Sequence, residues 1–276
     1  MSEPATITQG RAVTTVAERL FPSKTLRTVA KRLLKNYTVR QKFHGGTICC
    51  NAVDHSWAWA RGVKYETYDR ELQDVMLGLS RDRDVMIDVG SNVGGIALSV
   101  LLRNPDITAV CVDPNPIAID CLRQSQKLNK LEDRLTVFQA AVSGADEKIS
   151  FDFGESVMGH VSDAGETVDT IPLLGLLDQY ANGSRCLLKI DVEGYEKTLV
   201  PAFKSADQLA NTVLVIDLHP KDYNGLGDPA GCVAHLKSLG LTITKLDGTP
   251  LDTVLEDDFS EIVARVDPQA NSPSPT

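Results

Sequence analysis

Two short segments of the chain combine residue types that suit ligand binding and acid–base chemistry. The first, DVGSNVGG (88–95), sets an acid before a glycine-rich bend. The second, LLKIDVEGYE (187–196), follows an apolar run with four charged residues, Lys189, Asp191, Glu193 and Glu196. Charged groups at the end of a buried strand need a ligand, a charged partner or solvent. Both segments are therefore predicted to contribute to one functional site.

The bend between Gly90 and Gly94 is predicted to hold a small organic ligand. Glycine takes positive φ and lets the backbone approach a ligand closely. The helix expected after the bend would point its N–H groups and the positive end of its dipole at the same place. This suits a ligand carboxylate, such as that of the methionine part of S-adenosylmethionine, with Ser91 and Asn92 in the bend and Asp88 beside the ligand's ammonium.

The ends of the next two expected strands complete the predicted site. Asp113 ends the second strand, where an acid can accept hydrogen bonds from both ribose hydroxyls of an adenosine. Pro114 and Pro116 stiffen the turn that presents it. The third strand ends with Gln139 and Ala140, where an adenine ring would rest. S-adenosylmethionine is therefore the predicted cofactor.

A nicotinamide dinucleotide is the main alternative ligand. Its fingerprint, G-x-G-x-x-G, needs a second glycine that makes room for a pyrophosphate. Here Gly90 is followed by Ser91 and Asn92, and Asp88 would repel a pyrophosphate. Three alternatives to methyl transfer stay open: an NAD-dependent oxidoreductase, a catalytically silent module that binds S-adenosylmethionine, and a glycine turn with no ligand.

Methyl transfer to a hydroxyl needs a group that takes up the hydroxyl proton. His219, in VIDLHP (215–220), is the first candidate base, because the ordinary pKa of histidine suits this role near neutral pH. Asp191 is the second catalytic candidate and is also predicted to bind the cofactor, because it would face the cleft beside the methyl donor. Asp191 and Asp217 are the alternative bases. His219 could instead hydrogen-bond a loop, and the three residues together could bind a divalent ion. No metal ligand is assigned from the sequence.

A segment upstream of the first strand is also predicted to reach the site. Glu66 lies in YETYDREL (65–72), where it either contacts the methionine end of the cofactor or sits on the surface of a helix. Farther upstream lie His44, His55, Trp57 and Trp59. They either form a lid or acceptor pocket, or pack at the edge of the domain and in turns.

Positioning these groups requires a sheet whose strands end at one edge. Apolar runs alternate with helical stretches from residue 85 onward, and an extra hairpin is expected within 147–163. Near-continuous apolar strands separated by helices predict an α/β fold with a doubly wound, mostly parallel sheet. The expected strands are 85–89, 107–113, 135–142, 186–191, 212–218, 241–246 and 261–266, and the expected helices are 94–102, 116–128 and 230–239.

The charge of the chain is uneven. The first 42 residues hold nine Lys and Arg against two Glu, a net charge of +7, whereas the whole chain of 276 residues carries −9. The −16 of the remainder argues against nucleic acid as the main partner. Residues 13–36 read as helical, with a break at Pro22 and Ser23. The second part, SKTLRTVAKRLLKNY (23–37), is basic and amphipathic; it packs on the domain, contacts an acidic membrane surface or a partner, or serves as a cleaved leader.

Three parts are expected along the chain: a basic helical extension and lead-in over 1–60, a catalytic domain over 61–266 and a disordered tail over 267–276. No apolar run is long enough to predict a membrane span, and the first ten residues lack the apolar core of a secretory signal. The six scattered cysteines form no CxxC pair and are expected to be buried and reduced, which favours a cytoplasmic protein. The oligomeric state is not indicated.

Several motifs occur together in one order and resemble the FkbM family of S-adenosylmethionine-dependent methyltransferases. They are DVGSNVGG (88–95), CVDPNP (111–116), AAVSG (140–144), LLKIDVEGYE (187–196) and VIDLHP (215–220), and YETYDREL (65–72) is similar as well. The resemblance covers about residues 43–266, and its most specific piece is the K-I-D-V-E-G segment. It implies a Rossmann-like sheet of seven strands with the last antiparallel. It also implies O-methylation of a hydroxyl on a sugar, glycolipid or polyketide-like small molecule.

Three positions depart from the pattern of that family. Asp113 stands where the family more often has Glu, Tyr195 replaces a small residue, and Val200-Pro201 interrupts a helix. Because the residue before a proline is biased out of the α region, we expect this helix to kink or stop early. The substrate pocket is the part that these differences would reshape.

Overall fold

The computed structural model describes most of the chain from residue 37 to residue 266. Described are residues 29, 33–34, 37–55, 63–145, 148–152, 160–161, 165–221, 223, 226–251, 253, 258 and 260–266. Four predictions lie outside these residues: the helical segment 13–36 apart from residues 29, 33 and 34, the tail 267–276, and the lid roles of Trp57 and Trp59.

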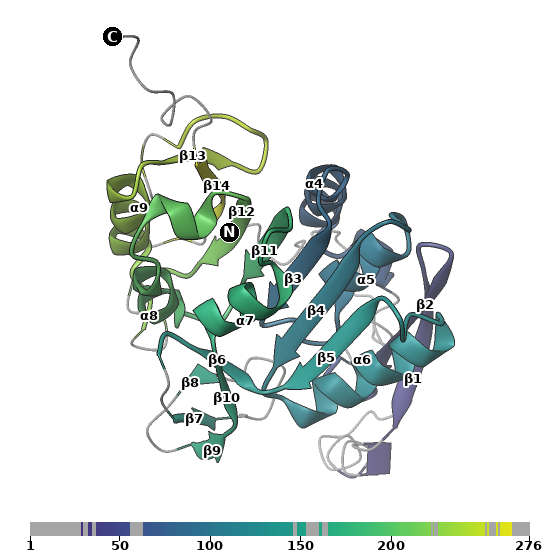
Figure 1. Ribbon diagram of the computed structural model, residues 1–276. Coiled ribbons are helices and arrows are strands. Elements are labelled where there is room, and N and C mark those ends of the chain that lie inside the picture. The colour runs from purple at the N-terminus through teal and green to yellow at the C-terminus, as the bar shows by residue number, and fades with distance from the viewer. Residues whose placement is uncertain are drawn as a thin grey trace, which may run out of the picture.

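A seven-stranded sheet forms the centre of the fold (Figure 1). β14 is antiparallel to both of its neighbours, and all other neighbouring strands are parallel. The predicted mostly parallel sheet of seven strands is therefore confirmed. The order across the sheet is β13 (Leu241–Lys245), β14 (Ser260–Val266), β12 (Thr212–Leu218), β11 (Cys186–Ile190), β3 (Val85–Val89), β4 (Thr108–Asp113) and β5 (Leu135–Gln139).

The strand order reverses beside β3. The chain runs from β3 outward to β4 and β5, and then returns to the other side of β3 to form β11 and β12. In open α/β sheets, ligands bind beyond the carboxyl ends of the strands at such a switch point. The ends of β3 and β11 are therefore the place to look for the site.

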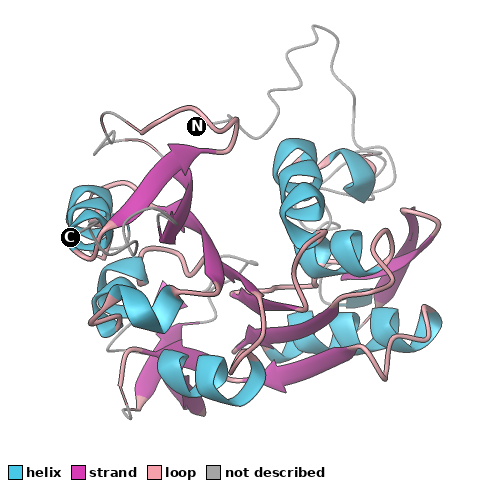
Figure 2. Cartoon of the chain, turned by 45° about the horizontal axis from the view of Figure 1, so that its top comes forward, coloured by secondary structure: helices cyan, strands magenta, loops and turns pink. Residues whose placement is uncertain are grey.

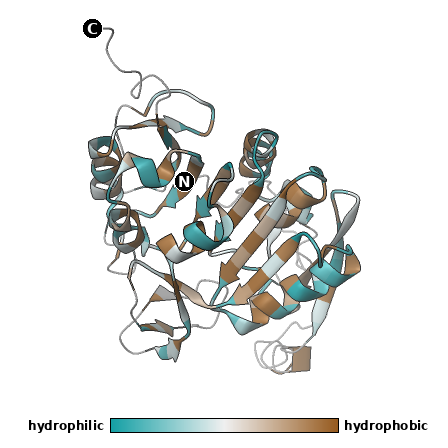
Figure 3. Ribbon diagram, viewed as in Figure 1, coloured by the Kyte–Doolittle hydropathy of each residue, from teal (hydrophilic) through white to brown (hydrophobic). Residues whose placement is uncertain are grey.

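Helices cover both faces of the sheet, and each face has its own apolar core (Figure 2). Successive residues of β3 alternate between them: Met86 packs in one core with Leu98 and Leu122, and Ile87 in the other with Leu236. The apolar colour of the central strands is plain in Figure 3. One face carries α4 (Arg70–Ser80), α5 (Gly95–Leu101) and α6 (Pro116–Leu128), and the other α7 (Leu173–Tyr180), α8 (Glu196–Leu199) and α9 (Pro229–Ser238).

An N-terminal hairpin, which the sequence analysis did not predict, packs on α6. Its strands are β1 (Thr38–Phe43) and β2 (Gly46–Asn51), paired antiparallel. The Cys49 N–H donates to Ser125 Oγ at 2.8 Å, and both residues are buried. The hairpin therefore packs on the helix layer of the sheet, although it precedes residue 61, the predicted start of the domain.

The chain between β5 and β11 adds short strands beside the main sheet. β6 (Ala141–Ser143) pairs in parallel with β10 (Thr170–Pro172). β7 (Ile149–Asp152) pairs antiparallel with β8 (His160–Val161), which is the extra hairpin expected within 147–163, and also with β9 (Glu166–Val168). Three single turns of 3-10 helix complete the elements: η1 (Tyr65–Thr67), η2 (Val200–Ala202) and η3 (Ala206–Leu209).

The helix after the charged segment is short, as the Val200-Pro201 pair predicts. α8 has only four residues, and the chain then tightens into η2. Val200 itself stays in the α region, at φ −58° and ψ −42°, so the expected departure of this residue from the α region was wrong. The proline ends the α-helical hydrogen bonding without turning the chain away.

Two simple predictions from composition also have structural counterparts. All six cysteines are buried and none forms a disulfide. Within the described part of the chain, no helix combines the length and the apolar character needed to cross a membrane.

Candidate active site

The glycine bend lies at the switch point between β3 and β11. Gly90 and Gly94 have φ of +78° and +79°. A Cβ at Gly90 would overlap the carbonyl oxygen of Asp191, and one at Gly94 would overlap the side chain of Leu122. Asn92 stands where a dinucleotide fingerprint has its second glycine, and it takes φ +50°, which Asn tolerates better than most residues. The two glycines are thus required by packing within the chain itself.

All five backbone N–H groups of the bend, residues 90–94, donate to acceptors within the chain. Gly90 and Ser91 donate to the Val112 carbonyl, at 2.9 and 3.2 Å, and Asn92 donates to Asp113. Val93 and Gly94 donate to the Asn92 side chain and the Ser91 carbonyl. A ligand in this place would therefore meet side chains and the start of α5 rather than the N–H groups of the bend.

Asp113 joins the bend to the turn after β4. Its Oδ2 accepts the Asn92 N–H at 2.8 Å, and its Oδ1 accepts the Asn115 N–H at 2.8 Å. Each carboxylate oxygen keeps a further lone pair for another donor. Burial raises the pKa of Asp113 to about 6, against the lowering effect of the two backbone N–H groups. The carboxylate is 8% exposed, so it is placed as the sequence analysis expected, at the edge of the buried sheet.

A buried histidine from the N-terminal segment supports the bend. His55 Nδ1 accepts the Asn51 N–H at 3.2 Å, so the ring proton is on Nε2, which donates to Asn92 Oδ1 at 3.1 Å. Burial lowers the pKa of His55, which keeps the ring neutral. Of the two interpretations of His55, packing is the one that these contacts favour, and the histidine helps to hold Asn92 in its left-handed conformation.

The buried Lys189 pairs with two aspartates. Its Nζ lies 2.9 Å from Asp191 Oδ2 and 3.7 Å from Asp88 Oδ1, and the lysine and Asp88 are almost fully buried. Burial opposes the charged form of the lysine, but Asp191 and Asp88 together raise its pKa above the ordinary value. Lys189 therefore offsets part of the negative charge at the ends of β3 and β11.

Three buried polar atoms around the bend make no hydrogen bond of ordinary length within the described residues, although the Ala97 backbone and Lys189 lie near Asp88, and Cys111 lies near Ser91. The three atoms are both carboxylate oxygens of Asp88 and the hydroxyl oxygen of Ser91. Burial raises the pKa of Asp88, against the nearby charge of Lys189. Unsatisfied buried acceptors are costly, and a donor group such as an ammonium would satisfy them. Asp88 and Ser91 are therefore where the sequence analysis placed them and fit a ligand with N–H donors.

A hollow of about 250 Å³ opens beside Asp113. It is lined by Pro114, Pro116, Gln139, Glu166, Thr167, Val168 and Asp169. Gln139 thus lies where the sequence analysis expected an adenine ring. Ala140 does not line the hollow: it packs in the apolar core, and its N–H donates to the Asp113 carbonyl at 3.1 Å. The segment with β9, which supplies four of the lining residues, was not foreseen as part of the site.

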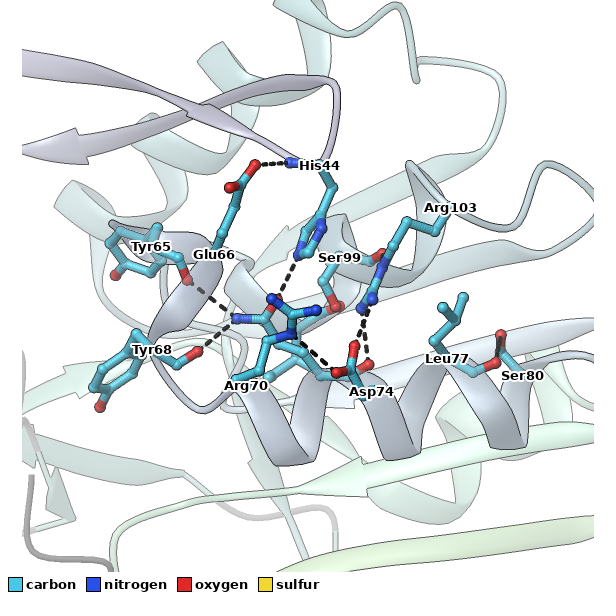
Figure 4. A network of polar contacts seen from close by, with 12 residues as sticks. His44, Tyr65, Glu66, Tyr68, Arg70, Asp74, Leu77, Ser80, Ser99 and Arg103 are labelled. Carbon is cyan, nitrogen blue, oxygen red and sulfur yellow. Dashed lines mark hydrogen bonds and ion pairs between the residues drawn. The ribbon is translucent and has the colours of Figure 1, made fainter. Parts of the chain in front are cut away.

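Glu66 serves the N-terminal hairpin in this structure. Its Oε1 accepts the N–H of His44, in the turn between β1 and β2, at 2.7 Å (Figure 4). Beside it, the buried Gln73 of α4 bonds His44 Nε2 and donates to the Tyr65 and Tyr68 carbonyls. A contact between Glu66 and a cofactor would need this carboxylate to leave His44, so its predicted role in binding stays a prediction.

His219 lies between two glutamates. Nδ1 is 3.0 Å from Glu196 Oε1, and Nε2 is 3.5 Å from Glu193 Oε2. Burial alone would lower the pKa of His219, but hydrogen bonds to Glu193 and Glu196 raise it to about 11. An imidazolium cannot take up a proton, so these contacts speak against the predicted role of His219 as the base. Both glutamates were predicted to belong to the site, but their contacts with His219 were not, because they form only where the turn before α8 packs against the end of β12.

Asp191 and Asp217 end neighbouring parallel strands. Ile190 of β11 pairs with Ile216 of β12, and Asp191 and Asp217 are the next residues after this pair. The two aspartates therefore lie side by side at the ends of the two strands. Lys189 lowers the pKa of Asp191 against the effect of burial, whereas burial and the charge of Asp191 raise the pKa of Asp217 to about 8. The structure thus brings Asp191, Asp217 and His219 together, as the sequence analysis expected.

Four more residues belong to this group, and the sequence analysis did not single them out. Burial raises the pKa of Tyr68 and that of Tyr223, and the charges of Asp191 and Asp217 add to both shifts, so both phenols lie near the acids. Tyr223 Oη donates to Glu193 at 3.0 Å. Asp69 and Glu261 are also coupled electrostatically to Asp191. Glu261 lies near Asp191 because β14 pairs antiparallel with β12, which places Glu261 opposite Asp217. No local signal in the sequence indicates this position of Glu261.

Known proteins similar to this chain are methyltransferases. A family model described as the methyltransferase small domain matches residues 73–153. The FkbM enzyme of Streptomyces tacrolimicus, a 31-O-demethyl-FK506 methyltransferase, is 24% identical over 59% of this chain and 74% of its own length. The fold is that of a class I methyltransferase. The resemblance to the FkbM family that the motifs indicate is thus supported by a relative of that name.

Two other comparisons are partial or distant. The release factor glutamine methyltransferase of Aquifex aeolicus is 30% identical over 76 residues, which cover 27% of each protein, so the chain spans about a quarter of that relative. The solved precorrin-6y C5,15-methyltransferase of Geobacter metallireducens has 16% sequence identity and a TM-score of 0.43, over 73% of this chain and 89% of its own.

Proposed function

We propose that this protein is an S-adenosylmethionine-dependent O-methyltransferase that acts on a hydroxyl of a sugar, glycolipid or polyketide-like small molecule. The observation that carries the proposal is the position of Asp113, between the glycine bend and the hollow of about 250 Å³. A carboxylate there can accept ribose hydroxyls, while the hollow takes a flat ring. The FkbM relative, whose name gives an O-demethylated substrate, supports the oxygen as the methyl acceptor.

The described residues fit the parts of S-adenosylmethionine. Asp113 would hold the ribose, Pro114 and Gln139 would enclose the adenine, and the unpartnered oxygens of Asp88 and Ser91 would receive the ammonium. Gly90, Asn92 and Gly94 shape the bend. Glu66 and Ala140 contribute indirectly, through the hairpin turn and the core. When bound, the cofactor supplies a methyl group activated by its sulfonium.

The cluster at the ends of β11 and β12 is the proposed acceptor side. An acceptor hydroxyl placed here would give its proton to Asp191, which the Lys189 ion pair keeps ionised, or, above about pH 8, where its own carboxyl is ionised, to Asp217. In the absence of a bound ion, the His219 imidazolium, held by Glu196, would stabilise the developing negative charge on the oxygen. The chain's task is to align this oxygen with the methyl group, since displacement at carbon needs an in-line approach.

A screen with labelled S-adenosylmethionine tests the proposal. The full chain is incubated with a panel of sugars, glycolipids and polyketides, and with matched compounds that carry an amine or thiol in place of the hydroxyl. Mass spectrometry should find an added methyl group on an oxygen. Transfer only to nitrogen, sulfur or carbon would contradict O-methylation, and failure to bind adenosylhomocysteine would contradict the cofactor.

We also propose that the catalytic unit begins with the hairpin at Thr38 and ends near Val266. The hydrogen bonds from the hairpin to α6 and from His55 to Asn92 support this start.

A further inference from the structure

The side chains of Asp191, Asp217 and His219 converge at the carboxyl ends of β11 and β12. Each offers one ligand atom, and these three atoms all lie within 4.8 Å of one another. Ligand atoms bound to one small divalent ion at about 2.1 Å lie at most about 4.2 Å apart. The longest of these separations therefore exceeds that limit by at most about 0.6 Å, and the other pairs would lie closer together around the ion.

The backbone that carries these residues is rigid. Asp217 lies on β12, His219 follows it directly, and Asp191 follows β11. The two strands are parallel neighbours inside the sheet, and each is buried over nearly its whole length. A preformed set of ligands on rigid strands costs little to organise when an ion binds.

One oxygen of this group lacks any partner. Asp217 Oδ1 is shielded from solvent, and within the described residues it accepts no hydrogen bond. Buried carboxylate oxygens are normally hydrogen-bonded or bound to a cation. Lys189 does not meet this need, because its ammonium lies 2.9 Å from Asp191 and 3.7 Å from Asp88.

The surroundings of His219 suit a metal ligand. Its Nδ1 lies 3.0 Å from Oε1 of Glu196, which is 2% exposed and also accepts the Val192 N–H at 3.0 Å. A ligating histidine commonly donates its second ring N–H to a carboxylate, which sets the ring orientation. With Nδ1 directed at Glu196, Nε2 is the nitrogen that would coordinate an ion, which would replace its 3.5 Å contact with Glu193 Oε2.

We propose that Asp191, Asp217 and His219 form a binding site for a divalent cation, with Glu196 as the residue that orients the histidine. The charge nearby favours a cation, because Asp69, Asp88 and Glu261 interact electrostatically with Asp191, and Glu193 lies 3.5 Å from His219. Two carboxylates and one imidazole suit ions that accept both oxygen and nitrogen, and Mn²⁺ is the natural probe. The ion would bind and orient the acceptor oxygen, and this role rests on the proposed function. The binding of the ion to these three residues does not depend on that function.

Binding of Mn²⁺ to the full chain tests the site. After removal of metals with a chelator, Mn²⁺ is titrated into the protein, and the free ion is measured by electron paramagnetic resonance. We expect one ion per chain. Asp217→Asn and His219→Gln should each weaken binding at least about tenfold, as should the supporting change Glu196→Gln. The control Asp106→Asn should leave Mn²⁺ binding unchanged, because Asp106 is exposed and lies before the first residue of β4, at the opposite end of the strand from Asp113.

Circular dichroism and urea unfolding first establish that each variant is folded. Should the Asp217 variant fail to fold, His219→Gln carries the test. Absence of Mn²⁺ binding to the natural protein, or equal binding by the natural protein and the folded Asp217 and His219 variants, would overturn the site. Calorimetry with adenosylhomocysteine separates this from the proposed function, because a failed cofactor site would lose the nucleoside and still bind Mn²⁺.

Discussion

The Oδ2 atom of Asp113 accepts the N–H of Asn92 at 2.8 Å, so one carboxylate joins the end of β4 to the glycine bend that follows β3. The same carboxylate accepts the N–H of Asn115 through its other oxygen. Any ligand that binds Asp113 is therefore linked to the conformation of both turns. This makes Asp113 the residue whose replacement should affect the proposed cofactor site most.

Asp113→Ala should weaken the binding of adenosylhomocysteine by about 10- to 100-fold. A hydrogen bond to a charged group contributes about 1.5–3 kcal/mol, and 1.4 kcal/mol is about a tenfold change in affinity. Asp113→Asn, which keeps one acceptor oxygen, should have a smaller effect. Isothermal calorimetry gives the affinities, with Asp106→Asn as the control. Equal affinities for all four proteins would show that the ribose binds elsewhere.

The affinity for adenosylhomocysteine should rise with pH through about 6 and level off above about 7. Burial raises the pKa of Asp113 to about 6, so the carboxylate form, which accepts both hydroxyls, becomes the major one only above that pH. Below it, a proton occupies one oxygen and removes an acceptor. Calorimetry between pH 5 and pH 8 measures the profile. The Asp113→Asn variant should show a flat profile, and an unchanged slope in that variant would assign the pH dependence to another group.

Gly90→Ala should destabilise the protein more than Gly183→Ala. Both glycines have positive φ, +78° and +74°, so an alanine costs about 1–2 kcal/mol at either position. Only at Gly90 would the new Cβ overlap a backbone atom, the carbonyl oxygen of Asp191, whereas the space around Gly183 is open. Relief of that overlap should add about 1–3 kcal/mol to the loss at Gly90. Urea unfolding provides both free energies, and equal losses would mean that β3 and β11 separate more easily here than the structure indicates.

His55→Ala should reduce both stability and cofactor affinity, whereas His235→Ala should reduce stability alone. Each histidine makes a hydrogen bond inside the fold, His55 to Asn92 Oδ1 and His235 to the Phe203 carbonyl. Loss of either should cost about 1–3 kcal/mol of unfolding free energy. Only His55 supports the bend, so only its variant should bind adenosylhomocysteine several-fold more weakly. Unfolding and calorimetry on both variants make the comparison. The same affinity in the two variants would remove His55 from the support of the site.

The sheet could be predicted because its strands carry their own signals. Val85–Val89 and Cys186–Ile190 are short apolar runs that end in charged or glycine residues, and such runs are typical of buried parallel strands. Asp88, Asp113 and Asp191 could be placed for the same reason, since each stands at or just beyond the end of such a run. Their spacing along the chain already implies that they meet at one edge.

The parts that could not be predicted depend on contacts between distant segments. The buried side chains of the hairpin of β1 and β2, such as Phe43 and Ile48, pack in the same core as residues of α6, about 75 residues later in the chain. The role of His219 also changed, because Glu193 and Glu196 reach its two nitrogens only where the turn before α8 packs against the end of β12. Histidine protonation follows such neighbours rather than the local sequence.

A crystal structure of the protein with adenosylhomocysteine is the decisive measurement. We predict that both ribose hydroxyls lie within hydrogen-bond distance of the Asp113 carboxylate, that the adenine fills the hollow beside Gln139, and that the sulfur faces Asp191. A ligand bound with its ribose away from Asp113, or bound at another place on the protein, would contradict the proposed cofactor site and the chemistry that follows from it.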